Sequence, residues 1–379
     1  MGVLTPSVSP PSACTQTCPT LARSTTTHTL VFRTILSLDA MPKFTNPRRT
    51  RSDSAIVRRL RRQPKIGRPM RLLRRGSYTA VYSWKPGQVM RFYPHTKGTT
   101  SVAKTLMQKL TNERFVYTMV SMSDDPDSRF VHRGRIIENH TSYGFLERRA
   151  HGDALDYLST PKRAKDSSLL VRLKMAMEMV RGMRFLHNHH VFMKDFKLEN
   201  CLLFRKKDGS LMLRVADFNI VQHGVVQLYS GVDETMRCRG TFLAPEEQCK
   251  ESSVGLAADI YRVGHALYLL FFVAAHEEKT RGQEHLQWDH LFPTLLDGRA
   301  FDGDGSLAVR EQLIQLWKED PLVRVDRTTL TCIGTVLDRL ILPMLQKDPT
   351  ERVLGFVSMN EYWTYMEGVI HWIATTALK

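Results

Sequence analysis

The stretch Met193-Lys194-Asp195-Phe196-Lys197-Leu198-Glu199-Asn200 decides how this sequence is interpreted. It follows a segment whose apolar residues recur at helical spacing, which predicts a long helix ending before it. Asp217 comes seventeen residues after Asn200 and is preceded by the strand-like Leu211–Val215. A carboxylate and an amide oxygen in one cleft suit Mg²⁺, which takes few protein oxygens and completes its shell with phosphate oxygens. The spacing therefore predicts a Mg²⁺ site beside this stretch.

Further segments follow in a fixed order. They are Phe185–Asp195 directly upstream, then Gly240-Thr241-Phe242-Leu243-Ala244-Pro245-Glu246, Asp259-Ile260-Tyr261-Arg262-Val263-Gly264 and Leu345-Gln346-Lys347-Asp348-Pro349-Thr350-Glu351-Arg352. In this order the segments resemble the catalytic domain of the eukaryotic protein kinases, over about residues 70–370. The resemblance implies that Arg352 pairs with Glu246.

The resemblance also implies roles for the residues of the opening stretch. Asp195 matches the catalytic aspartate that orients the substrate hydroxyl and accepts its proton. Lys197 matches the lysine that contacts the γ-phosphate of ATP, and its presence favours serine or threonine over tyrosine as substrate. Asn200 and Asp217 match the two Mg²⁺ ligands. ATP and Mg²⁺ are the implied cofactors.

The segment in the place of the family's glycine-rich loop is degenerate. Residues 74–81 hold only Gly76 of the three glycines, followed by Val81. Those glycines let backbone amides close over phosphates without a Cβ in the way. By resemblance, Gly76 and Val81 still belong to the nucleotide site.

The ATP-binding lysine of the family is replaced by Arg91. The exchange is not conservative, because a planar guanidinium differs from a compact ammonium in shape and donor geometry. Glu113, 22 residues later, matches the helix glutamate that pairs with that lysine. Lys85 and Lys97 are nearby candidates for supplying the missing ammonium.

The predicted hinge between the two parts of the domain runs from Tyr143 to Asp153. Leu146 matches the gatekeeper residue of the family. The backbone at Glu147 and Arg149 would bind adenine, and Asp153 would face the ribose. These assignments rest on the resemblance alone.

Three departures lie near the catalytic stretch. Met193 replaces a histidine, which we expect to change packing more than chemistry. Lys194 replaces the arginine that commonly meets an activation-loop phosphate, so phosphorylation control is not implied. Asn219 replaces a glycine, and this change is mild because asparagine tolerates left-handed backbone.

The pattern of apolar residues predicts a small strand-rich part followed by a larger helical part, and the resemblance implies that these form the two lobes of an α+β kinase fold. Strands are expected at 78–84, 88–93, 130–137 and 142–146, a helix at 102–119, and mainly helices after about residue 153. The smaller lobe, with an antiparallel sheet and one helix, is assigned to 70–147, and the larger helical lobe to 148–370. Residues 371–379 are assigned to a tail. The apolar run Ala266–Ala275 is too short for a membrane span and predicts a buried helix.

Most of the positive charge lies outside this predicted domain. The chain has 379 residues and a formal net charge of +16, of which residues 48–75 carry +11. Residues 1–47 are rich in Ser, Thr and Pro and are expected to be disordered, and residues 48–69 to form a basic linker. The six cysteines form no CxxC pair, which favours a reduced intracellular protein.

Two hypotheses for function remain open at this point. The first is a serine/threonine protein kinase with weakened ATP binding, acting on protein substrates. The second is a pseudokinase that binds nucleotide or partner proteins with little catalysis. Residues 48–75 would engage an import receptor or an acidic partner, which makes a nuclear location compatible with the sequence, while nucleic acid is a weaker alternative and no membrane partner is expected. The eroded motifs resemble those of divergent kinases of large DNA viruses such as herpesviruses.

Overall fold

A computed structural model describes most of the predicted domain. The described residues are 71–75, 79–93, 100–139, 142–159, 168–223, 229–230, 243–248, 253–280, 311, 313–315 and 326–377. Several predictions lie outside them: the tail 1–47, the basic linker 48–69, Gly76, Lys97 and the segment Gly240–Phe242.

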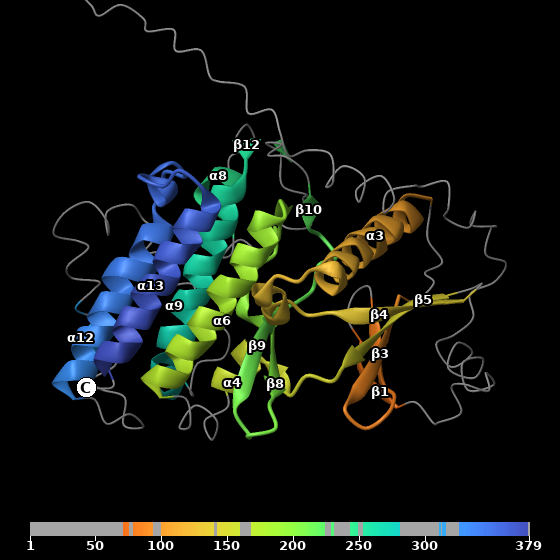
Figure 1. The fold of residues 1–379 in the computed structure, drawn as a ribbon, viewed down its shortest axis with the longest axis horizontal. Coiled ribbons are helices and arrows are strands. Elements are labelled where there is room, and N and C mark those ends of the chain that lie inside the picture. The colour runs from red at the N-terminus through yellow and green to blue at the C-terminus, as the bar shows by residue number, and fades with distance from the viewer. Residues whose placement is uncertain are drawn as a thin grey trace, which may run out of the picture. The chain divides into compact units, whose positions relative to one another are not determined.

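The first part of the domain is a five-stranded antiparallel sheet in the order β1-β2-β3-β5-β4 (Figure 1). Its strands are β1 (Leu72–Arg75), β2 (Ala80–Ser83), β3 (Gln88–Phe92), β4 (Gly134–Asn139) and β5 (Ser142–Arg148). The turn from β2 to β3 passes through Gly87 at φ +72°, a left-handed conformation that glycine adopts without a Cβ penalty. The short β2–β3 connection sets the register that places the site.

The alternation of side chains gives this sheet two different faces. Ala80, Tyr82, Met90 and Phe92 form a buried cluster on one face. Arg91 pairs with Phe145 in the ladder and Val89 with Glu147, so the arginine and the glutamate share the opposite face. This second face carries the charged groups.

Helix α3 (Thr100–Met122) follows the third strand and confirms the predicted helix at 102–119. Tyr117 on α3 packs edge-to-face on Phe145 of the sheet, with ring centres 5.0 Å apart. The predicted strand at 130–137 is only partly correct, because η2 (Pro126–Phe130) is a short 3-10 helix and β4 begins at Gly134. Asp125 caps η2 by accepting a hydrogen bond from the Asp127 N–H, and Pro126 fits its first turn.

The rest of the domain is mainly helical, and four long helices lie side by side in Figure 1. They are α6 (Leu169–Asn188), α9 (Leu256–Thr280), α12 (Arg327–Val336) and α13 (Met359–Ala377), with the shorter α4 (Ala154–Ser159) and α8 (Pro245–Gln248) beside them. The run predicted to be a buried helix lies inside α9, and its residues 266–272 are all buried. The predicted boundary at residue 370 falls within α13, because Ile373 is still part of the core.

One helical stretch, Arg327–Leu345, is long and apolar enough by composition to cross a membrane. It comprises α12, η5 (Leu337–Ile341) and η6 (Leu342–Leu345). Half of its most apolar window is buried inside the domain, where α12 packs on α13 and η6 on α9. Its apolar character is therefore that of a core element.

Short strands join the two parts of the domain and carry the site. β6 (Gly152–Asp153), β8 (Cys201–Arg205) and β9 (Leu211–Val215) form a three-stranded sheet, and β7 (Val191–Phe192) pairs with β10 (Gln222–His223). The last pair is β11 (Tyr229–Ser230) with β12 (Ser253–Val254), and the remaining 3-10 turns are η3 (Leu198–Asn200) and η7 (Glu351–Val353). The antiparallel sheet followed by helices confirms the predicted α+β, two-lobed fold class.

Candidate functional site: the catalytic loop and the buried arginine

The loop between β7 and β8 brings three predicted site residues together. The Lys197 ammonium contacts both carboxylate oxygens of Asp195, at 3.0 and 2.9 Å. The Asn200 side-chain amide donates to the Asp195 carbonyl at 2.7 Å, which fixes the backbone on which the carboxylate stands. Asp195 remains partly exposed while Lys197 and Asn200 are buried. The Asp195 carboxylate is therefore accessible to solvent, while Lys197 contacts the carboxylate and Asn200 fixes its backbone.

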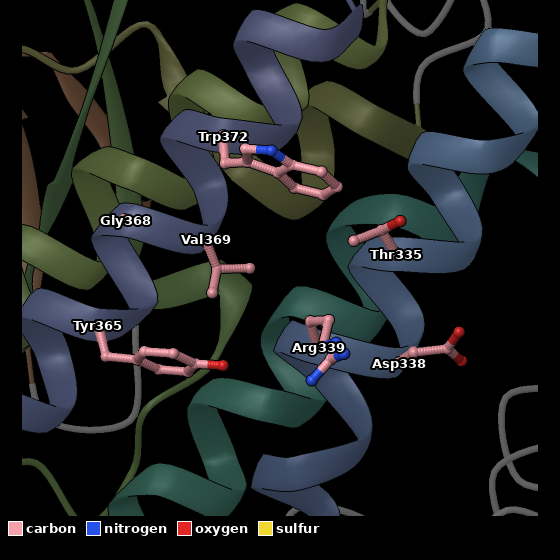
Figure 2. Close-up of a pocket in the computed structure, with 7 residues that line it drawn as sticks. All are labelled: Thr335, Asp338, Arg339, Tyr365, Gly368, Val369 and Trp372. Carbon is pink, nitrogen blue, oxygen red and sulfur yellow. The ribbon is translucent and has the colours of Figure 1, made fainter.

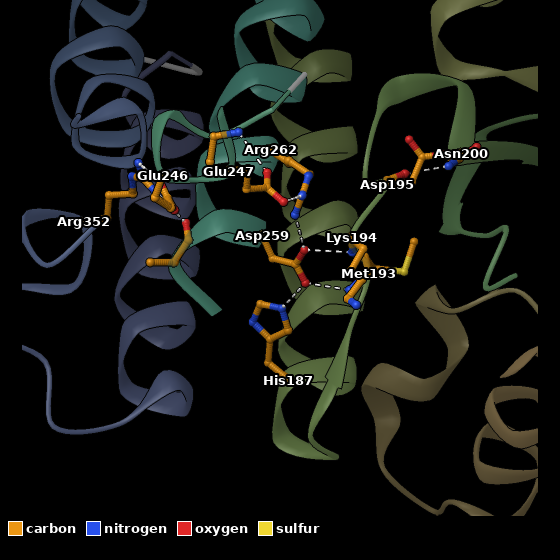
Figure 3. A network of polar contacts seen from close by, with 12 residues as sticks. His187, Met193, Lys194, Asp195, Asn200, Glu246, Glu247, Asp259, Arg262 and Arg352 are labelled. Atoms are coloured by element: carbon orange, nitrogen blue, oxygen red, sulfur yellow. Dashed lines mark hydrogen bonds and ion pairs between the residues drawn. The ribbon is translucent and has the colours of Figure 1, made fainter. Parts of the chain in front are cut away.

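Asp259, at the start of α9, fixes the beginning of this loop (Figure 3). Its two carboxylate oxygens accept hydrogen bonds from the Met193 and Lys194 N–H groups at 2.6 and 3.0 Å. Arg262 donates to the same carboxylate at 2.9 Å. Burial alone would raise the pKa of Asp259, but the hydrogen bond from His187 and the charge of Arg262 lower it. The carboxylate thus stays ionised and holds the loop, with the Lys194 backbone at φ +55°.

A tryptophan on the last helix supports this carboxylate through a histidine. The Trp363 indole N–H of α13 donates to Nδ1 of His187 at 3.0 Å. Because Nδ1 accepts, the proton of the neutral imidazole sits on Nε2, 3.3 Å from the Asp259 carboxylate. All three side chains are buried. The helix end that carries His187 is therefore structural.

Asp217 follows β9 and lies near the catalytic loop, where the Ala216 N–H donates to the Asn200 carbonyl at 2.8 Å. Its backbone has φ +65°, and burial raises the pKa of its carboxyl group. The Asn219 side-chain amide donates to Oδ1 of Asp217. Asn200 uses its amide nitrogen on the loop and keeps its oxygen for another ligand.

The donor set of Asn200 and Asp217 fits Mg²⁺. Both supply oxygen, and the cation completes its shell with phosphate oxygens and water. Among the described residues, no group of three or more His, Cys, Asp or Glu side chains could hold a metal ion. A metal at this place therefore depends on oxygens from a ligand.

Arg91 lies at the centre of a second, buried cluster. Its Nη1 donates to Glu113 at 2.6 Å, and its Nη2 donates to Glu147 at 2.7 Å and to the Tyr117 hydroxyl at 2.9 Å. Its Nε also donates to Glu147, at 3.1 Å. The side chains of Arg91, Glu113 and Glu147 are 12%, 0% and 8% exposed. All three guanidinium nitrogens are thus engaged by protein groups.

The pKa values of the two carboxylates in this cluster are shifted in opposite directions. Burial, with the nearby negative charge of Asp217, raises the pKa of Glu113 to about 7, although Arg91 opposes the shift. Burial would also raise the pKa of Glu147, but Arg91 and His132 lower it below its usual range. The Arg91 guanidinium therefore pairs with Glu147, which is firmly ionised, and with Glu113, whose pKa lies near neutrality. Glu113 also accepts a hydrogen bond from the Tyr93 hydroxyl at 2.7 Å.

The helix that carries Glu113 is tied to the segment that carries Asp217. The Asn112 side-chain amide on α3 donates to the Asn219 and Val221 carbonyls at 3.2 and 3.0 Å. Phe218 packs edge-to-face on Tyr117, with ring centres 6.1 Å apart. The two clusters described above therefore form one connected site.

A third ion pair closes the helical part. Arg352 donates to both oxygens of Glu246, at 2.6 and 2.8 Å, and to the Ala257 carbonyl at 2.9 Å (Figure 3). This contact confirms the pairing expected from the sequence. Arg262 similarly joins Glu247, so α8 is held to α9 and to the end of the domain.

The family model described as the protein kinase domain matches residues 75–363. This chain belongs to the protein kinase family. Members of the family in general use ATP and Mg²⁺ and act on protein substrates, and the fold and the paired motifs agree with that assignment.

Curated relatives are serine/threonine-protein kinases at low identity. The human serine/threonine-protein kinase DCLK3 is 29% identical over 130 residues, which are 34% of this chain and 18% of the relative. A calcium and calcium/calmodulin-dependent serine/threonine-protein kinase from rice is 26% identical over 204 residues, 49% of this chain and 36% of the relative. A Drosophila erecta serine/threonine-protein kinase is 24% identical over 235 residues, 60% of this chain and 26% of the relative. The chain thus matches about a third or less of these relatives' length.

The nucleotide-binding part of the kinase domain differs from the family pattern in several places. Gly76 lies outside the described residues, and Val81 is half-buried opposite Arg91 in the β2–β3 ladder. Lys85 lies in the exposed turn between β2 and β3, whereas Glu113 is buried against Arg91 and Tyr93. The structure therefore gives no support to Lys85 as the replacement for the family's lysine.

The hinge of the kinase domain is partly occupied by its own backbone. The Arg149 N–H donates to the Gly87 carbonyl at 2.8 Å, so its predicted contact with adenine requires this bond to open. Asp153 accepts a hydrogen bond from the Asp156 N–H at 2.8 Å and so caps α4 with one carboxylate oxygen. Its predicted contact with ribose stays a prediction.

The contact made by the Glu147 side chain was not predicted from the sequence. Leu146 pairs with Met90 on the face of the sheet away from Arg91, and Glu147 points to Arg91. Glu147, and not Leu146, therefore contacts Arg91. The available signal was a glutamate directly after the apolar pair Phe145-Leu146 of the strand, because a carboxylate that becomes buried needs a partner.

Two hollows of the kinase domain lie beside other residues. One, of about 930 Å³, lies against the β2–β3 turn and is lined by Trp84, Gly87, Ile137 and Leu146 among others. Figure 2 shows the other, a groove of about 530 Å³ between α12–η5 and α13, lined by Thr335, Asp338, Arg339, Tyr365, Gly368, Val369 and Trp372. Neither contains Asp195 or Asp217.

Replacing Asn112 by leucine should weaken the link between α3 and the Asp217 segment. The change removes three hydrogen bonds, one accepted from Gln108 and two donated to the Asn219 and Val221 carbonyls. The two carbonyls lose their side-chain partner, which costs about 1–3 kcal/mol. Denaturant unfolding should show this loss, and hydrogen exchange of residues 217–221 should quicken. Gln108→Leu on the same helix removes only the bond to Asn112 and is the matched control. Equal protection of residues 217–221 in both variants would contradict the proposed link.

Proposed function

We propose that this chain is an active serine/threonine protein kinase that transfers the γ-phosphate of ATP to protein hydroxyls. The observation that supports this most directly is the geometry of Asp195, Lys197 and Asn200. A partly exposed carboxylate held by an ammonium and by a fixed backbone is suited to orient a hydroxyl and take its proton.

Each residue of this group has a separate task in the proposed reaction. Asp195 accepts the proton of the serine or threonine hydroxyl as that oxygen bonds to the γ-phosphorus, while the bond from this phosphorus to the β,γ-bridging oxygen breaks and ADP leaves. Lys197 donates from its ammonium to the transferred group, next to the carboxylate it already contacts. Asn200 and Asp217 would hold Mg²⁺, which when bound neutralises charge on the phosphates. Asp259 keeps the loop in place during transfer.

Binding of ATP is proposed to be weak. Every guanidinium nitrogen of Arg91 already donates to protein groups, so contact with α- or β-phosphate oxygens requires one of these bonds to be shared or broken. The hydrogen bond from the Arg149 N–H to the Gly87 carbonyl also weakens ATP binding, because it occupies a donor of the hinge. We therefore expect a raised KM for ATP.

A pseudokinase is the second candidate, and specific contacts favour it. Asn219 occupies one oxygen of Asp217, and the Arg149 N–H is already bonded to Gly87. In that case the domain would bind nucleotide or partner proteins with little transfer.

Transfer of label from γ-labelled ATP to a generic protein substrate separates the candidates. Asp195→Asn should lower transfer about 100- to 10,000-fold, the usual contribution of a positioned proton acceptor. Asp338→Asn makes the same change on an exposed residue away from the loop and should leave transfer unchanged. Transfer that survives Asp195→Asn contradicts the mechanism. A wild type without transfer that still shows an ATP- and Mg²⁺-dependent rise in Tm supports the pseudokinase.

We propose that the basic segment 48–75 directs the kinase to the nucleus or binds it to an acidic partner, and has no part in catalysis. Its charge of +11 suits an import receptor or an acidic partner. Loss of nuclear accumulation of a fluorescent fusion after deletion of 48–69 would support an import role.

A further inference from the structure

A group of basic residues gathers where the sheet meets the β8–β9 hairpin. Arg133 precedes β4, Arg148 ends β5, Arg205 and Lys206 lie at the end of β8, and Arg214 lies on β9. We call these five residues the arginine surface. Four of them are exposed, and Arg214 is half-buried. None of them belongs to the catalytic loop or to the Arg91 cluster.

One phenylalanine ring organises the arginine surface. The guanidinium carbons of Arg148 and Arg214 lie 5.6 and 5.2 Å from the centre of the Phe204 ring. Arg148 also donates to the Arg205 carbonyl at 2.7 Å. Such contacts hold two guanidinium groups close to each other, in spite of their like charge.

The carboxylates near this surface are engaged in local contacts. Glu178 is buried and accepts a hydrogen bond from the Leu213 N–H at 2.7 Å, with Lys206 at 4.0 Å. Asp208 accepts from the backbone and the hydroxyl of Ser210 in a turn. Little negative charge therefore remains for the arginines.

Arg214 is the residue of the arginine surface with a buried side-chain donor that no described protein group accepts. Its Nε is buried and has no hydrogen-bond partner among the described residues. Burial and the positive charges of Arg133 and Arg148 lower its pKa. Because its Nε is not used by a described protein acceptor, Arg214 adds positive charge to the arginine surface that these residues leave largely uncompensated.

We propose that the arginine surface binds an acidic segment of a partner protein. Guanidinium groups bind carboxylates through paired hydrogen bonds, and several along one edge suit a linear run of Asp or Glu. This binding does not depend on whether the kinase transfers phosphate.

The chemistry of the surface favours an acidic peptide over single-stranded nucleic acid. Proteins that bind single strands add exposed aromatic rings on which bases stack. The ring in this surface, Phe204, is 1% exposed and is covered by His132, which stacks on it at 5.3 Å. The arginine surface therefore offers positive charge but no exposed ring on which a base could stack.

Fluorescence anisotropy with a labelled glutamate-rich peptide tests the proposal on the full chain at physiological ionic strength. Arg133→Gln/Arg148→Gln should weaken binding about five- to tenfold, as expected for two solvent-accessible ion pairs. Arg327→Gln/Arg339→Gln removes two exposed arginines from α12 and η5 and should change affinity less than about twofold. Both variants keep the basic segment 48–75 and have equal net charge, so only the place of the lost charge differs.

Three outcomes overturn the proposal. Equal affinity of the two double variants for the peptide would show that binding follows net charge alone. Tighter binding of a single-stranded oligonucleotide, lost in the same variant, would assign the surface to nucleic acid. If the Arg133→Gln/Arg148→Gln variant unfolds early, the exposed Arg133→Gln alone is used, and unchanged affinity there again contradicts the proposal.

Discussion

Arg91→Lys, which restores the lysine of the family, should destabilise this kinase and should not improve it. The guanidinium reaches Glu113, Glu147 and Tyr117 at once, and an ammonium cannot match that arrangement. A buried carboxylate would lose its partner, which costs about 3–5 kcal/mol. Chemical denaturation should show that loss in the free energy of unfolding, and kcat/KM for ATP should not exceed the wild-type value.

Removing Glu147, the second carboxylate that pairs with Arg91, gives a matched control. In Arg91→Lys/Glu147→Leu the lysine has only Glu113 to satisfy, which is the pairing that the family uses. We expect this double variant to regain most of the stability and to exceed the wild type in kcat/KM for ATP. A single Arg91→Lys variant as stable as the wild type would contradict the idea that Glu147 makes arginine necessary.

Asp259→Asn should damage the loop between β7 and β8 although it touches no reacting group. The asparagine keeps the shape, but its one oxygen cannot accept from the Met193 and Lys194 amides as two oxygens do. The charge opposite Arg262 is lost as well, so we expect a loss of about 3 kcal/mol in the free energy of unfolding. The turnover rate should fall while KM for ATP changes little, because the loop and not the nucleotide site is released.

The pH dependence offers an independent check of this second prediction. Folding lowers the pKa of Asp259, so its contribution to stability is present above the usual carboxylate pKa and is lost as the pH falls. The difference in stability between wild type and Asp259→Asn should therefore narrow on acidification. Asp338→Asn, an exposed position on η5, makes the same chemical change away from the loop and serves as the control. A constant difference across the acid range would contradict the assigned role.

Much of the helical part of the kinase could be predicted because its helices have local signals and its motifs match the family. The pair of Glu246 with Arg352 joins residues 106 positions apart and was implied by the resemblance to the protein kinases, and the contact between them confirms that expectation. The buried helix at α9 followed from a run of apolar residues. Even the short helix at Pro126 had a signal, since Asp125 before a proline is a common helix start that was overlooked.

The sheet was harder to predict because its contacts join distant residues. Whether Glu147 faces Arg91 depends on strand register, and a shift by one residue would turn it to the other face. The bond from Arg149 to Gly87 likewise exists only because the β2–β3 turn meets the end of β5. Spacing along the chain carries no information about either contact.

The hydrogen bond from Trp363 to His187 has a consequence for how the kinase is made. The indole lies 176 residues after the histidine, and the histidine supports the aspartate that holds the catalytic loop. A ribosome that has already produced Asp195 and Asp217 has therefore produced a loop whose support is still missing. The nascent chain can complete the support of this loop only after α13 emerges, so the order of synthesis makes the loop one of the last parts of the domain to be fixed.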